Sequence, residues 1–92
     1  MSELLDALAK YVAVLNRSAQ ETHQAEDRRS YTQHLAAAAQ FFVAAHTDRL
    51  EELRGLVASE RHAYGWGYLS HAEGSAAEKA FDEFAALVEA TK

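Results

Sequence analysis

Proline is absent from this chain of 92 residues, and only four residues are glycine. These two residue types disfavour a helix interior most strongly, whereas alanine, leucine, glutamate and arginine favour it, and those four are abundant here. No stretch alternates apolar and polar residues in the way that a half-buried strand does. The sequence therefore predicts an all-α protein.

Four segments carry apolar residues at steps of three and four, the spacing that places side chains on one face of a helix. They run from residue 2 to the mid-twenties and over about residues 31–45, 49–64 and 76–90. In the second segment the predicted apolar face consists of Tyr31, Leu35, Ala38, Phe42 and Ala45, and Phe41 widens it. Such helices predict a small antiparallel bundle of about four helices, forming one domain over residues 1–92.

Capping residues predict where these helices begin and end. Three pairs have the spacing of a capping box: Ser30 with Gln33, Asp48 with Glu51, and Ser75 with Glu78. Residues 16–30 lose the apolar spacing, so the first helix either continues there or turns. We expect a turn near residues 25–29, directly before Ser30. Gly65 and Gly67 predict the end of the third helix.

The charge and cysteine content excludes several classes of partner. The chain carries 14 acidic and 9 basic residues, which give a net charge of −5. Nucleic acids and anionic membranes attract cationic surfaces, so we expect neither as a partner. Cysteine is absent, which rules out disulfides and thiolate metal sites. No apolar stretch approaches the roughly 20 residues of a membrane span, and the start MSELLDALAK lacks the pattern of a signal peptide. We therefore expect a soluble, cytoplasmic protein.

Catalytic and metal-binding patterns are weak. The five histidines, His23, His34, His46, His62 and His71, contain no pair three or four residues apart. The Glu-x-x-His pattern of di-iron bundles is missing, and no glycine-rich phosphate loop follows a strand. We expect histidines at the surface or at the rim of the bundle, no cofactor, no bound metal and no catalytic activity.

Glu60 stands out because it falls inside the apolar face of the third helix, between the angular positions of Leu53 and Leu56. A buried carboxylate is costly unless it is paired or hydrogen-bonded. Two interpretations stay open. Glu60 reaches solvent where its helix frays, or it lies in a pocket or dimer interface, bonded to an arginine, a tyrosine or a histidine.

An aromatic cluster follows directly, in the stretch RHAYGWGYLSHAEG of residues 61–74. Tyrosine and tryptophan bury large areas and are enriched where partners bind. One interpretation is structural, with the tryptophan closing one end of the bundle. The others are a protein contact site and a small-molecule pocket. The candidate binding residues are Glu60, His62, Tyr64, Trp66, Tyr68 and His71.

The small core favours association. Alanine dominates the apolar residues and isoleucine is absent, so burial against a second copy would add stability that so small a core lacks. We expect a non-enzymatic interaction protein that forms a homodimer through the alanine-rich second helix (Ala36 to Ala39) and the aromatic cluster of residues 61–74. Two alternatives remain. One is a small-molecule-binding module built on Tyr64 to Tyr68. The other is an inhibitor or immunity-type protein whose acidic fourth helix binds a basic partner, since residues 73–92 carry five acids and two lysines.

Overall fold

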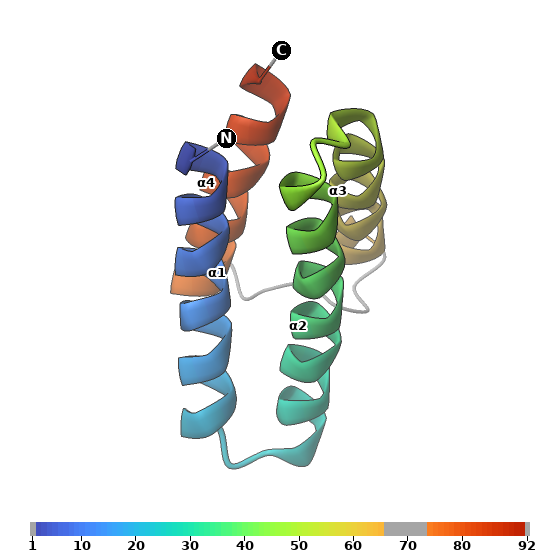
Figure 1. Cartoon of the computed structure of the whole chain (residues 1–92). Helices are drawn as coiled ribbons and strands as arrows, with labels where there is room; N and C mark the ends of the chain where they lie inside the picture. Colours follow the sequence, from blue (N-terminus) through green and yellow to red (C-terminus); the bar gives the residue numbers. More distant parts are fainter. Residues whose placement is uncertain (1, 66–73, 92) are drawn as a thin grey trace.

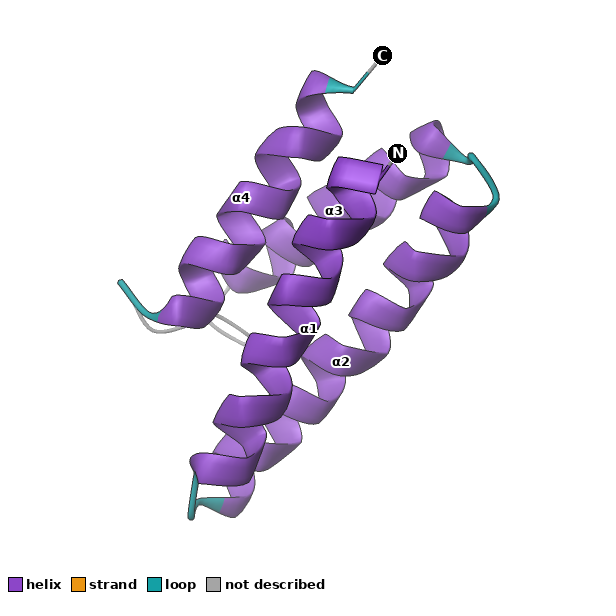
Figure 2. Ribbon diagram, turned by 60° about the vertical axis from the view of Figure 1, so that its left-hand side comes forward, coloured by secondary structure: helices purple, strands orange, loops and turns teal. Residues whose placement is uncertain are grey.

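The computed structural model describes residues 2–65 and 74–91, which fold into four helices. They are α1 (Ser2–Glu21), α2 (Ala25–His46), α3 (Leu50–Gly65) and α4 (Ala76–Ala90). Within those two ranges the structure contains no strand. The all-α prediction is therefore confirmed (Figure 2).

The helices form an antiparallel bundle in which each helix packs against two others. Contacts join α1 to α2, α2 to α3, α3 to α4, and α4 back to α1. Figure 1 shows α1 and α2 side by side, with α4 behind α1 and α3 behind α2. The α1–α2 hairpin reaches further down than the other two helices, which are 16 and 15 residues long against 20 and 22. The small antiparallel bundle that the sequence predicts is confirmed, with a two-helix projection at one end. No helix among the described residues is long and apolar enough to cross a membrane.

The core is apolar and draws residues from all four helices. Its largest fully buried side chains include Tyr11, Phe41 and Phe84. The Phe41 and Phe84 rings stack with centroids 5.6 Å apart, and Tyr11 meets Phe81 edge to face at 5.5 Å. Aromatic pairs in these geometries add about 0.5–1.5 kcal/mol beyond the area that they bury. These contacts join α2 to α4 and α1 to α4 across the centre of the bundle.

The turn between α1 and α2 lies earlier than the capping pattern predicts. Residues 22–24 form it, and Ser30 lies inside α2. The Thr22 hydroxyl accepts the backbone N–H of Gln24 at 3.3 Å, and the Thr22 carbonyl accepts the Arg28 guanidinium at 3.1 Å. A threonine that bonds the backbone two residues ahead stabilises a turn. The prediction of a turn at residues 25–29 was wrong. These residues are polar but helical, because α2 projects beyond α3 and α4 there and needs no apolar face.

The buried face of α2 is also rotated from the predicted one. Its buried residues are His34, Ala38, Phe41, Ala44 and Ala45. Tyr31, Leu35 and Phe42, which the apolar spacing placed at the centre, lie half-buried at its edge.

The corner between α2 and α3 is a Schellman motif. Asp48 has a positive φ of 54°, and the N–H groups of Arg49 and Asp48 donate to the carbonyls of Ala44 and Ala45 at 2.9 and 3.4 Å. This pairing satisfies carbonyls that a helix end leaves without partners. The capping box predicted at Asp48 was wrong. Its backbone ends α2, and the carbonyl of Arg49 accepts the first bond of α3, from Leu53.

The N-terminus of α4 has the predicted cap. The Ser75 hydroxyl accepts the Glu78 N–H at 3.2 Å, and the Glu78 carboxylate accepts the Gly74 N–H at 3.1 Å. Gly74 has a φ of 77°, which favours glycine. The Ser75–Glu78 prediction is confirmed. The predicted end of α3 at Gly65 and Gly67 stays a prediction, because Gly65 is the last residue described before residue 74.

Candidate functional site

Glu60 of α3 and His34 of α2 form a polar pair between the two helices. Oε1 of Glu60 lies 3.2 Å from Nδ1 of His34, and the two side chains are 14 % and 1 % exposed. Of the two interpretations left open for Glu60, the structure therefore favours the second, with a mostly buried carboxylate bonded to a histidine. The contact lies within one chain, so it explains the position of Glu60 without a dimer interface.

His34 is a site residue that the sequence analysis misplaced. We expected it at the surface or rim, whereas it is buried at the centre of the inner face of α2. It precedes Ala38 by four residues and Phe41 by seven, so helical spacing does place it with the buried residues. The sequence analysis missed His34 because it used only apolar residues to locate the inner face of this helix. That choice placed the predicted inner face toward Leu35 and Phe42.

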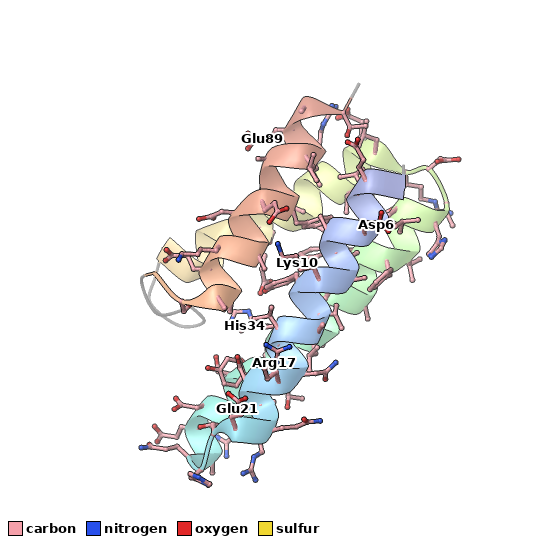
Figure 3. The ribbon with its side chains drawn as sticks, turned by 90° about the vertical axis from the view of Figure 1, so that its left-hand side faces the viewer. Asp6, Lys10, Arg17, Glu21, His34 and Glu89 are labelled. Carbon is pink, nitrogen blue, oxygen red and sulfur yellow. The ribbon has the colours of Figure 1, made fainter. Side chains whose placement is uncertain are left out.

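This pair is suited to holding two helices together rather than to catalysis. A histidine oriented by a carboxylate is the arrangement of a general base, but a base must reach the proton that it abstracts. The imidazole of His34 is buried inside the bundle. Figure 3 shows it beside α1, near the N-terminal end of α4. A buried hydrogen bond to a charged group contributes about 1.5–3 kcal/mol to stability, so we assign the pair a structural role.

The other predicted binding residues are not tested by the structure. His62 and Tyr64 belong to α3, but their side chains lie outside the described part, and Trp66, Tyr68 and His71 lie outside the described residues altogether. The aromatic cluster therefore stays a prediction. Among residues 2–65 and 74–91, no three histidines, aspartates or glutamates gather closely enough to hold a metal ion.

The charged residues of α1 all lie on one side of the helix. At 100° per residue, its five charges fall within an arc of roughly 60°: Glu3, Asp6, Lys10, Arg17 and Glu21. Four of these point toward the viewer in Figure 3. Lys10 forms an ion pair with Glu83 of α4 at 3.1 Å. The charged side of α1 is thus its outer side and the flank next to α4.

The flank of α1 next to α2 is uncharged, and α2 continues that surface. On α1 a row with steps of four, three and four residues consists of Leu5, Ala9, Val12 and Asn16. On α2 a row with the same steps consists of Leu35, Ala39, Phe42 and His46. The chain runs downward in α1 and upward in α2 in Figure 1. Because both helices are right-handed, both rows lie on the side of their helix that faces the viewer in that figure. We call these eight residues the uncharged face.

The uncharged face is partly apolar and partly open. Leu5, Val12, Leu35 and Phe42 are half-buried, and the other four residues are exposed. Val43, next to this face on α2, is 62 % exposed and is the one large apolar side chain that is exposed among the described residues. No aspartate, glutamate, lysine or arginine occurs between Arg29 and Asp48. Depletion of charge distinguishes the centre of protein interfaces from the rest of a protein surface.

Two grooves lie on other sides of the bundle. The first, of about 350 Å³ between α1 and α4, is lined by Glu3, Asp6, Ala7, Lys10, Glu83 and Leu87. The second, of about 310 Å³ between α3 and α4, is lined by Arg54, Val57, Ala58, Val88 and Glu89. The cations of both grooves are already engaged. Lys10 pairs with Glu83, and Arg54 pairs with Glu51 at 2.6 Å and donates to the carbonyl of Thr91.

Searches among protein-family models, curated proteins and solved structures return no match for this chain. A functional assignment therefore depends on the chain's own residues.

Proposed function

We propose that this protein is a non-enzymatic interaction protein that forms a homodimer through the uncharged face. The observation that carries the proposal is a two-helix surface without charge in a chain where 25 % of residues are charged. A surface exposed only to water has no need to exclude charge over about three turns of two neighbouring helices. A surface that packs against another protein does.

Net charge favours this face as the place where two copies meet. Each copy carries −5, so two copies repel one another over most of their surfaces. The uncharged face brings no like charges together. It also offers small and large side chains in alternation, with Ala9 beside Val12 and Ala39 beside Phe42. This alternation lets two helices interdigitate.

The size of the face predicts a weak dimer. Each row spans 12 residues, or about 18 Å, and two helices side by side are about 20 Å wide. The resulting footprint of about 360 Å² lies below the roughly 800 Å² of surface that each partner of a stable complex buries. We therefore expect a dissociation constant in the micromolar range or weaker.

The proposal modifies the interface expected from the sequence in one respect. The alanine-rich part of α2 contributes Ala39, with Ala36 exposed beside it. α1 supplies the second half of the surface, which the sequence analysis did not include. The contribution of the aromatic cluster to the dimer interface stays a prediction.

A charge placed at the centre of the face tests the proposal. In the Ala39→Glu variant, each copy brings a carboxylate into the dimer interface, and juxtaposed like charges cost several kcal/mol. We expect the dimer to weaken by about 100-fold or more. Ala86→Glu on the exposed side of α4 is the matched control, with the same change in net charge and no expected effect. Equal dimerisation of both variants in light scattering would contradict the proposal.

The two alternatives from the sequence stay predictions. The small-molecule module relies on Tyr64 to Tyr68, whose side chains are not described. A Trp66 fluorescence change on addition of a metabolite would favour it. The inhibitor alternative relies on the acidic outer side of α4, where Lys10 already pairs with Glu83. Binding of a basic protein that weakens steeply with salt would favour that alternative.

A further inference from the structure

One side chain of the uncharged face can take up a proton near neutral pH. Seven of its eight residues have aliphatic, aromatic or amide side chains, and the eighth is His46, the last residue of α2. Histidine is the residue whose charge ordinarily changes between about pH 5 and pH 8. The face is therefore uncharged only while His46 is neutral, and acidification adds one positive charge to the face of each copy.

The imidazole of His46 lies against the apolar part of the face. Its ring stacks on that of Phe42, one turn earlier in α2, with the two centroids 6.3 Å apart and the two planes inclined by 21°. Val43, three residues before His46, is the side chain that is 62 % exposed. A second copy that covers Phe42 therefore comes close to His46 as well, whichever way the second copy is oriented.

The charges nearest to His46 along the chain lie in the corner that follows it. On α2 itself, the stretch between Arg29 and Asp48 contains no charged aspartate, glutamate, lysine or arginine. Asp48 is exposed two residues after His46, in a single copy and in a dimer alike. Arg49 is paired with Glu52 of α3 at 3.4 Å. The corner therefore offers one carboxylate, Asp48, that belongs to the same copy.

The neighbouring helices direct their acidic residues away from this face. On α1, Glu3 and Asp6 lie about 160° and 100° around the helix from Leu5, on the charged side. On α3, Glu51 is paired with Arg54 at 2.6 Å. The eight residues that a second copy brings to the interface include no carboxylate. A proton on the histidine thus meets no opposite charge from the face of the other copy.

Protonation of His46 is consequently easier in a single copy than in the dimer. In a single copy, water solvates the imidazolium, and the last carbonyls of α2 favour a cation at the helix C-terminus. In the dimer, the second copy replaces that water with an uncharged surface, and loss of solvation disfavours the charged form. The dimer therefore binds fewer protons than two separate copies. An equilibrium shifts toward the state with fewer protons as the pH rises, and away from it as the pH falls.

We propose that His46 makes the homodimer pH-dependent, so that two copies associate above the range in which histidine titrates and separate as the pH falls through that range. This inference rests on the proposed homodimer and specifies how its interface is regulated. It does not depend on which helices of the two copies face one another, because each copy contributes one His46 in every arrangement of the two faces.

Sedimentation equilibrium at about pH 7.5 and about pH 5.5 tests the proposal. Exclusion of one proton from each copy should weaken the dimer by about 10- to 100-fold between these two values. The His46→Gln variant should not weaken, because protonation of the other histidines lowers the net negative charge and the repulsion between copies. His23→Gln is the matched control. This exposed histidine lies in the turn between α1 and α2, outside the face, so its variant should weaken like the parent protein.

The His46→Lys variant provides a second readout, since it carries the positive charge at both pH values. Its dimer should already be weak at about pH 7.5, by about the same factor as that of the parent protein at about pH 5.5. Circular dichroism at both values checks that the helices persist, because the buried His34 and Glu60 are common to all variants.

The outcomes separate this proposal from the homodimer itself. If the parent protein and His46→Gln dimerise with the same pH profile, or if His46→Lys dimerises as tightly as the parent protein, the role of His46 is overturned and the homodimer stands. A parent protein that stays monomeric at both pH values overturns both.

Discussion

The Glu60→Ala substitution removes the carboxylate that holds His34 between α2 and α3. Oε1 lies 3.2 Å from Nδ1 of an imidazole that is 1 % exposed, so water has little access to take its place. Loss of a buried hydrogen-bond partner costs about 1–3 kcal/mol. For a domain of this size, each kcal/mol lowers the melting temperature by about 4–8 °C. We expect Glu60→Ala to melt about 4–24 °C below the parent protein.

Two further variants make this experiment specific. Glu60→Gln keeps a side-chain oxygen as acceptor, so its loss should be smaller than that of Glu60→Ala. Glu52→Ala removes a carboxylate from the same helix. Glu52 pairs with Arg49 at 3.4 Å, and both side chains are more than half exposed. Exposed pairs of this kind contribute about 0–1 kcal/mol.

Thermal unfolding followed by circular dichroism gives all three values. Each variant is best combined with Ala39→Glu, so that association does not contribute to the melting temperature. If Glu60→Ala melts no lower than Glu52→Ala, the buried pair contributes little and the reasoning about His34 is refuted.

Three helix-end and helix-interior substitutions should change stability in known directions, each measured by urea unfolding against the parent protein. Gly55→Ala should stabilise by about 1 kcal/mol, because an added Cβ meets nothing within 4 Å in the interior of α3; no gain would indicate a contact at that position. Asp48→Gly should stabilise by about 0.5–1 kcal/mol, since its φ of 54° favours glycine; destabilisation would show that the aspartate side chain outweighs the backbone preference. Ser75→Ala should destabilise by about 1 kcal/mol by removing the acceptor of the Glu78 N–H, and an unchanged midpoint would mean that the cap contributes nothing.

The helical bundle was predictable because its determinants are local. Apolar spacing predicts the helices, and Ser75 with Glu78 predicts a cap that depends on four consecutive residues. The turn after α1 was not predictable in this way. Residues 16–30 lack an apolar face because α1 and α2 extend there beyond α3 and α4. Without apolar residues at helical spacing on either side, the sequence does not indicate where the turn between the two helices lies.

The position of His34 and the uncharged face needed the tertiary structure. Alanine occupies residues 36–39 without interruption, so this part of α2 has no contrast between apolar and polar sides, and its inner face cannot be oriented from spacing alone. The gap in charge between Arg29 and Asp48 is visible in the sequence. That it joins the uncharged flank of α1 becomes apparent only when the two helices lie side by side.

Sedimentation equilibrium of the unmodified protein tests the homodimer most directly. The measurement should cover about 1 µM to about 1 mM, which corresponds to binding free energies of about −8.2 to −4.1 kcal/mol. We predict that the average mass rises with concentration from 10.2 kDa toward twice that value, and that Ala39→Glu remains at the lower mass throughout. A mass of 10.2 kDa for the unmodified protein over the whole range would contradict the proposed function.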